Sequence, residues 1–295
     1  MRHLTLRQHY RRERMSTVQP IKYAVGGAAL CATSLVAAPV GAMTLKCPPD
    51  SVKVGPTCVD KYEESVWQIP RSRKSLVKAV LDGKATLAEL TSGGATQLSP
   101  SPSCSPAYPA NFPASGQWTP VQGSNPPSPG VYAVSIPGVL PSACITWFAA
   151  SQACALSGKR LITNREWQDA AAGTPDPGTD NGTTACNVDS PGPVSTGSRS
   201  SCKSSWGAFD MVGNLDEWVA DWADNNHGAC SDSTTAFGFG TFDFVCFGGD
   251  GHTHIPAPLR RGGFWFGPLG SGVFAHGTNV SPSDSFPYTA FRCAR

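Results

Sequence analysis

The sequence is poor in charged residues, which make up 15% of its 295 positions. It contains no Cys-x-x-Cys pair, which argues against the usual structural zinc sites and thioredoxin-type redox chemistry. No phosphate-binding glycine loop, nucleophile elbow or paired-carboxylate motif is present, so the common motifs of nucleotide binding and hydrolytic catalysis are missing. The sequence also lacks an internal repeat and any alternation of strands with helices, which excludes a repeat protein and a parallel α/β fold.

The N-terminal segment differs from the rest of the chain. Residues 1–22 carry six basic side chains and one acid, and residues 23–43 carry no charge and are rich in Ala, Gly and Val. A basic start, an apolar stretch and the small residues Val40-Gly41-Ala42 are typical of a secretory signal peptide. The alternative is an uncleaved membrane anchor, because the apolar stretch has about the length of a spanning helix. We assign residues 1–42 to a signal peptide and residues 43–295 to a single domain.

Removal of the signal peptide changes the formal net charge from +2 to about −3, because six bases and one acid leave with it. No basic cluster remains, so we expect no nucleic-acid partner. Of the 11 cysteines only Cys31 leaves, and the even number that remains is typical of the disulfide framework of an exported protein. We expect a monomer that is secreted, periplasmic or displayed on the cell surface.

Short strands and long irregular segments are predicted for much of the domain. Val52 and Val54 alternate with a polar residue, as in a hairpin strand, and residues 131–136 alternate in the same way. Residues 92–130 and 173–208 are rich in Ser, Pro and Gly and are predicted to be loops.

Few helices are predicted. Apolar residues recur at helical spacing within residues 74–90. Thr146 can cap a helix over residues 147–157. Thr163 and Glu166 have the spacing of a capping box, in which each side chain satisfies a backbone amide of the first helical turn.

Several motifs occur together in the second half of the chain. They are Ile145–Trp147 with Gly158–Leu161 and Thr163–Trp167, then Phe209–Trp222, and finally Leu259–Gly263 with Trp265 and Phe291–Cys293. In combination, and with an opening strand at Thr57–Glu63, they resemble the formylglycine-generating enzyme, or sulfatase-modifying factor, family. The resemblance covers roughly residues 46–295. It implies an α+β fold, the C-type-lectin-like fold of that family, with few helices and much irregular structure.

The same resemblance implies two structural features. One is a disulfide between Cys154 and Cys293, which are paired in the family. The other is calcium, which the family binds near the motif that holds Asn214 and Glu217, with Asn187 at a weaker position; oxygen ligands of this kind suit that ion. The alternative for these three residues is a buried polar turn without a metal. Beyond the family pairing, we expect four further disulfides: Cys47–Cys58, Cys104–Cys144, Cys186–Cys202 and Cys230–Cys246.

The catalytic residues of the family are missing. The family enzyme oxidises a substrate cysteine with copper(I), which two cysteines hold because soft thiolates select that ion. Those cysteines lie four and nine residues after the second glycine of the Gly-Gly pair, and Gly267 and Gly272 stand there in this chain. No cysteine lies between Cys246 and Cys293. We therefore expect no catalytic residues and a protein that is not an enzyme, with the formylglycine-generating oxidase as the alternative.

The C-terminal segment carries a second resemblance. Gly262–Trp265, Gly272–Ala275, Ser281–Ser283 and Phe291–Arg295 resemble the variable region of proteins that retroelements diversify, which place a hypervariable ligand-binding face on this fold. From Gly262 through Ser283 there is no Asp, Glu, Lys or Arg, and aromatic residues alternate with small polar ones, a composition that suits a binding surface. The candidate ligand-binding residues are Phe264, Phe266, Gly267, Leu269, His276, Asp284, Phe286 and Tyr288.

The resulting prediction is a module that binds a protein or glycan ligand. A structural envelope protein is a further alternative. We expect Trp265, Phe274 and Phe291 in the core and the aromatic and histidine candidates at the surface. If residues 264–266 form one strand, their side chains alternate, so Trp265 faces the core and its two neighbours face outward.

Overall fold

The computed structural model describes residues 45–110, 112, 130–176, 178–223, 231–232, 244–246, 256–268 and 270–295. Thr44–Arg295 form one compact unit. The expected signal peptide, residues 1–42, and the side chains of the expected Cys230–Cys246 disulfide lie outside the described residues. Within the described ranges, no helix is long and apolar enough to cross a membrane.

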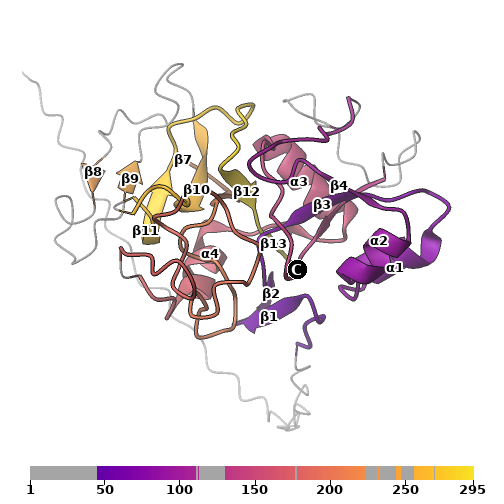
Figure 1. Ribbon diagram of the computed structural model, residues 1–295, viewed down its shortest axis with the longest axis horizontal. Coiled ribbons are helices and arrows are strands. Elements are labelled where there is room, and N and C mark those ends of the chain that lie inside the picture. Colours follow the sequence, from indigo (N-terminus) through magenta and orange to yellow (C-terminus); the bar gives the residue numbers. More distant parts are fainter. Residues whose placement is uncertain are drawn as a thin grey trace, which may run out of the picture. The chain divides into compact units, whose positions relative to one another are not determined.

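The strands of the described residues form three sheets (Figure 1). The largest has six strands in the order β12-β7-β10-β11-β9-β8. Their bounds are β12 (Thr289–Phe291), β7 (Asp216–Ala223), β10 (Ala257–Gly262), β11 (Gly272–Gly277), β9 (Phe244–Cys246) and β8 (Ser231–Asp232). A second sheet has the order β1-β2-β13-β6, and a third has the order β4-β3-β5. Their bounds are β1 (Ser51–Val54), β2 (Thr57–Asp60), β13 (Cys293–Ala294), β6 (Arg160–Leu161), β4 (Thr96–Leu98), β3 (Ser65–Gln68) and β5 (Val131–Val134).

Two predicted strands are confirmed and one predicted loop is partly wrong. β1 and β2 form the expected hairpin, with Val52 and Val54 buried and Lys53 exposed. β5 begins at the expected residue. Residues 92–130, however, contain β4, whose Leu98 is buried and pairs with Val66 of β3. Pairing with a neighbouring strand therefore overrides the Ser- and Pro-rich composition of that segment.

Two of the four helices of the described residues, α3 (Trp147–Leu156) and α4 (Asn164–Ala171), begin at the predicted caps. The other two are α1 (Lys74–Leu81) and α2 (Leu87–Ser92). The Thr146 hydroxyl accepts a hydrogen bond from the backbone of α3, and Thr163 and Glu166 form the predicted capping box of α4. The helical pattern of residues 74–90 is divided between α1 and α2, and Thr86 makes a second capping box that begins α2.

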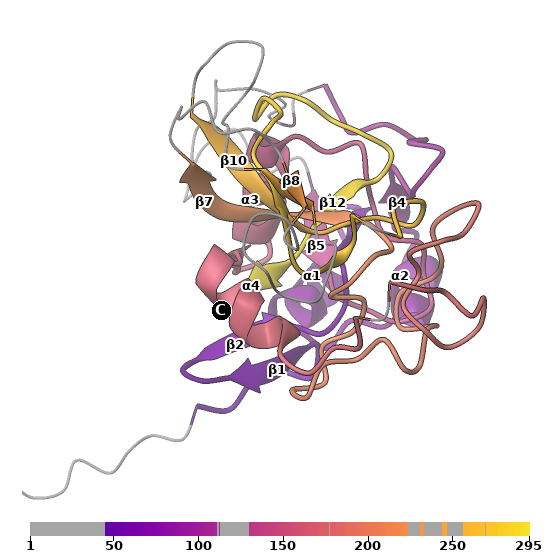
Figure 2. The same cartoon turned by 90° about the vertical axis from the view of Figure 1, so that its left-hand side faces the viewer.

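The C-terminal residues connect the six-stranded sheet to the four-stranded sheet. β12 runs parallel to β7, and β13 pairs with β2 and β6. Phe291 is fully buried and shares a core cluster with Trp218, whereas Trp167 belongs to a second cluster with Ala294. In Figure 2, α4 lies beside the β1–β2 hairpin, which agrees with its packing against both strands. The site described below therefore rests on strands held at the centre of the unit.

Four expected disulfides are confirmed. Cys154–Cys293 joins α3 to β13 across 139 residues of sequence, and Cys186–Cys202 closes part of the long loop of residues 173–208. The other two are Cys47–Cys58 and Cys104–Cys144. A long irregular loop in a compact domain needs such a restraint, because it has few ladder hydrogen bonds of its own.

Candidate ligand-binding site

The candidate site is built where β10 ends and the chain turns toward β11. Gly262 and Gly263 have φ angles of 91° and 78°, in the left-handed region. A Cβ atom on Gly263 would lie 2.4 Å from the Cα atom of Ser271, a distance that no side chain tolerates. Glycine at this position therefore allows the turn of residues 263–271 to fold back closely on itself.

Within this turn, neighbouring aromatic side chains point in different directions. Trp265 is 7% exposed and packs against Ala143, Leu215 and Ala290, whereas Phe266 is 54% exposed. The predicted burial of Trp265 and exposure of Phe266 are confirmed, and Phe264 is half-buried. The expected strand alternation is wrong, because these residues lie in a turn after β10. The backbone of the turn sets the directions of these side chains. It is held by hydrogen bonds from Trp265 N to the Asn214 carbonyl and from Ser190 N to the Trp265 carbonyl.

Four aromatic residues gather at the surface and are called the aromatic cluster below: Phe264, Phe266, Phe286 and Tyr288. The ring centroid of Phe264 lies 4.3 Å from that of Phe266 and 4.7 Å from that of Tyr288. Phe286 stacks on Tyr288 with the centroids 5.2 Å apart. Phe286 and Tyr288 are half-buried rather than fully exposed as expected, because the rings cover one another. The cluster joins the β10–β11 turn to the segment before β12.

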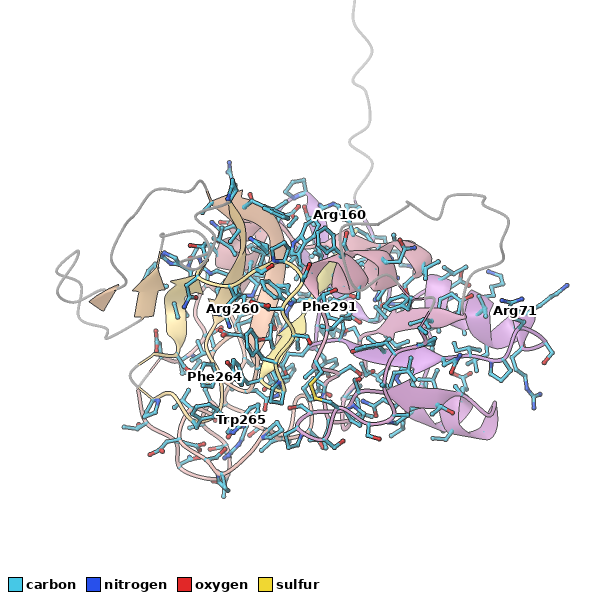
Figure 3. The ribbon with its side chains drawn as sticks, turned by 90° about the horizontal axis from the view of Figure 1, so that it is seen from above. Arg71, Arg160, Arg260, Phe264, Trp265 and Phe291 are labelled. Carbon is cyan, nitrogen blue, oxygen red and sulfur yellow. A yellow bond between two sulfur atoms is a disulfide. The ribbon has the colours of Figure 1, made fainter. Side chains whose placement is uncertain are left out.

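A pocket of about 330 Å³ opens beside the aromatic cluster. Four of the predicted ligand-binding residues line it: Phe264, Gly267, His276 and Tyr288. Figure 3 shows Phe264 and Trp265 in the same half of the unit as Arg260, with Arg71 at the far end. The volume is that of a small ligand site or of one large side chain.

Three further residues of the pocket form a hydrogen-bonded polar group. Arg260 donates from Nη1 to Oδ2 of Asp216 at 3.0 Å and from Nη2 to Oδ1 of Asn279 at 3.0 Å. Asp216 also accepts a hydrogen bond from Gly263 N. Burial raises the pKa of Asp216, and the positive charge of Arg260 opposes that rise. The sequence interpretation did not select these residues, although Asp216 and Arg260 lie within two of the recognised motifs.

Two predictions of exposure along β11 are wrong. His276, expected at the surface, is buried, and burial lowers its pKa to about 4, so it is neutral at pH 7. Phe274, expected in the core, is 42% exposed. The register of β10 on β11 shifts between two neighbouring residues of β10. Arg261 pairs with His276, but the next residue, Gly262, pairs with Gly272. This bulge breaks the regular alternation of side chains along β11.

The last two candidate residues are Asp284, which is not part of the pocket lining, and Leu269. Asp284 is half-buried, and its Oδ2 accepts a hydrogen bond from Ser281 N at 3.0 Å, which holds a local turn. Leu269 lies outside the described residues. Neither position adds a described polar group to the pocket.

The proposed calcium ligands are engaged with protein partners. The Oδ1 atom of Asn214 accepts hydrogen bonds from Asn187 Nδ2 and Val194 N. Glu217 is fully buried, and its carboxylate accepts hydrogen bonds from the Arg292 guanidinium and from Trp167 Nε1. The charge of the Glu217 carboxylate is therefore already neutralised by Arg292, which weakens its attraction for a cation. The residues present therefore do not fit the calcium site that the resemblance implied, and they match the alternative of a buried polar turn.

The positions of the copper ligands carry no thiol. Gly267 lines the pocket, and Gly272 begins β11. The eight cysteines whose side chains the structure describes are all in disulfides, so they supply no thiolate. The one cluster of described residues with metal-ligand spacing, Asp60 with Glu64 and Cys293, includes such a disulfide sulfur. The described residues therefore do not fit copper(I).

The fold and the site define an α+β domain of the C-type-lectin-like class, with few helices and with a C-terminal turn that carries an aromatic cluster beside a pocket. Residues 47–295 match the family described as sulfatase-modifying factor enzyme 1-like domain. The chain therefore belongs to this family. No curated protein matches it.

Several solved structures are similar to the chain. The Major Tropism Determinant U1 variant is 19% identical over 83% of this chain and 52% of its own length, with a TM-score of 0.41. The I1 variant is 28% identical over 50% of this chain and 37% of its own length, with a TM-score of 0.34. PvdO from Pseudomonas aeruginosa is 17% identical over 81% and 80% of the two chains, with a TM-score of 0.35. The chain spans about half or less of the Major Tropism Determinant chains, and at these scores the likenesses carry no functional conclusion.

Proposed function

We propose that this protein is an exported binding module that recognises a ligand through its C-terminal face. The observation that carries the proposal is the aromatic cluster beside the pocket, built from the β10–β11 turn and the segment before β12. Large rigid rings supply contact area at little cost in conformational entropy, and such rings dominate the binding energy of most interfaces. Here Phe266 is 54% exposed, and its ring contacts those of Phe264, Trp265 and Tyr288.

The alternative enzymatic function has little support in the site. Oxidation of a substrate cysteine through copper needs two thiolates at positions that Gly267 and Gly272 occupy. A glycine side chain can neither hold the ion nor take part in proton transfer. A sulfatase-derived peptide that contains cysteine, incubated with the protein, copper(I) and oxygen, should show no conversion to formylglycine. Conversion that depends on the protein would overturn the proposal.

Export is supported by the disulfides. Disulfides persist in oxidising compartments, and this domain contains four of them among its described cysteines. A basic and then apolar N-terminal segment is the other support. Mass spectrometry of the protein from its native source should find the N-terminus at Met43, after cleavage behind Ala42.

Sequencing of the same locus in several isolates tests the binding proposal without knowledge of the ligand. If retroelement diversification acts on this face, substitutions should be confined to residues 264–289 and should fall mostly at adenines. Trp265 and Gly263 should stay unchanged, because the fold depends on them. Substitutions spread evenly over the exposed surface would contradict diversified binding and favour a structural envelope protein.

A further inference from the structure

Two side chains of the pocket, Asn279 and Tyr288, carry polar atoms that make no hydrogen bond to a described residue; Arg260 Nε also has no partner, but it is fully buried. The hydrogen bond from Arg260 to Oδ1 of Asn279 fixes the orientation of that amide. The Nδ2 atom of Asn279 is therefore the end of the side chain that can donate to a ligand. Neither this Nδ2 atom nor the Tyr288 hydroxyl makes a hydrogen bond to a described residue. Burial raises the pKa of Tyr288, so the hydroxyl keeps its proton at neutral pH. The pocket thus offers an amide donor and a hydroxyl that both donates and accepts.

The charges around the pocket cancel. Arg260 and Asp216 are paired at 3.0 Å, and His276 is neutral at pH 7 because burial lowers its pKa to about 4. No other lining residue except Tyr288 can titrate. A charged ligand group would lose its hydration without meeting an unpaired opposite charge, which disfavours carboxylates and ammonium groups alike.

Aromatic rings and glycine backbone form much of the pocket lining. The rings of Phe264 and Tyr288 lie 4.7 Å apart at an angle of 31°. Much of the remaining lining is glycine backbone, from Gly263, Gly267, Gly270 and Gly277. These positions leave space that side chains would fill, and the rings of Phe264 and Tyr288, which pack on each other, form an apolar wall beside it.

The small number of available polar groups distinguishes between ligand classes. A sugar ring brings several hydroxyl groups into a site, and each one left without a partner costs the free energy of its lost hydration. The amide donor of Asn279 and the hydroxyl of Tyr288 together match the one acceptor and one donor of a single carboxamide. The surrounding aromatic cluster instead favours an apolar polypeptide surface with one polar projection.

We propose that this pocket takes one carboxamide side chain, a glutamine or an asparagine, that a polypeptide ligand presents to the aromatic cluster. The carbonyl oxygen of that side chain accepts a hydrogen bond from Asn279 Nδ2, and its amide nitrogen donates to the Tyr288 hydroxyl. The inference rests on the proposed binding function and adds the chemistry of the group at the centre of the interface.

Small analogues test the pocket directly. Propionamide stands for the carboxamide, propionate for a carboxylate, butylammonium for lysine and methyl glucoside for a sugar. Titration of the ¹⁵N-labelled protein with each probe gives a dissociation constant from the shifts of the side-chain amide signal of Asn279. Propionamide should bind in the millimolar range and about fivefold to tenfold more tightly than the other three.

Two conservative variants give the matched controls. Tyr288→Phe keeps the ring and removes the hydroxyl, and Asn279→Asp keeps the acceptor for Arg260 and removes the amide donor. The shifts are then followed on backbone amides of the turn. Each variant should weaken propionamide about fivefold, and Asn279→Asp should also raise the affinity for butylammonium. Ser283→Ala, an exposed change near the same face, should leave all affinities unchanged.

Each other outcome overturns the inference. Tightest binding of propionate or butylammonium would show that the pocket is not neutral. Tightest binding of methyl glucoside would show that the pocket binds a glycan. Absence of propionamide binding, or propionamide affinity that is unchanged in both variants, would refute the proposal that the pocket binds a carboxamide. The proposed binding function fails separately, when substitutions among isolates do not concentrate in residues 264–289.

Discussion

Replacing Trp265 by alanine separates the folding role of the C-terminal turn from its binding role. The ring is 7% exposed and covers Ala143, Leu215 and Ala290. A tryptophan buried to this extent hides roughly 200 Å², which at about 25 cal/mol/Å² corresponds to about 5 kcal/mol. Partial collapse of the neighbouring rings into the space reduces the loss, so Trp265→Ala should lower the free energy of unfolding by about 3–5 kcal/mol.

Phe266→Ala is the matched comparison in the same turn. The side chain is 54% exposed, and the unfolded chain already covers part of the rest, so the expected loss of stability is about 1 kcal/mol. Urea unfolding followed by far-ultraviolet circular dichroism, with the disulfides intact, measures both variants. Equal losses for the two variants, or a larger loss for Phe266→Ala, would refute the assignment of Trp265 to the core and of Phe266 to the binding face.

Four other changes have defined outcomes. Phe266→Ala should weaken binding of an identified ligand by about 2 kcal/mol or more, measured by calorimetry, while Trp206→Ala, an exposed aromatic outside the cluster, should not. Arg292→Ala leaves buried Glu217 unpaired and should cost about 3–5 kcal/mol of unfolding free energy in urea. Burial raises the pKa of Asp210 to about 7, so its contribution to stability is complete at acidic pH and is lost as the pH rises through about 7; the unfolding free energy of Asp210→Asn should lack this decline. Replacing Cys154 and Cys293 together by alanine opens a loop of 139 residues and should cost about 5 kcal/mol by thermal or urea unfolding.

The pH prediction for Asp210 has a definite sign. Below its ordinary value near 3.8 the carboxyl is protonated in both the folded and the unfolded protein. Above that value the unfolded state releases the proton first, because the buried carboxyl holds it until about pH 7. Unfolding therefore becomes easier as the pH rises. A wild-type profile that stays level or rises between about pH 4 and 7 relative to Asp210→Asn would contradict this reasoning.

The sequence by itself determined those features that depend on residues close together in the chain. Thr146 and Thr163 cap α3 and α4 because the amides they satisfy lie three residues away. The alternation of Val52, Lys53 and Val54 gave the hairpin for the same reason. The family motifs added the Cys154–Cys293 disulfide and the fold, and the two glycines at the copper positions showed that the catalytic pair is missing.

Only the tertiary structure decided the interior of the site. The register shift between β10 and β11 buries His276 and exposes Phe274, and no pattern within β11 reveals the partner strand that causes it. Arg260 meets Asp216 and Asn279 across 44 and 19 residues of sequence, so composition around each residue gives no sign of the pocket they share. The same holds for Glu217, whose oxygens suit calcium in isolation but pair with Arg292, which lies between β12 and β13. Hydrogen bonds and ion pairs act over a few ångströms in space, and it is the folding of distant segments together that sets which groups lie within that range.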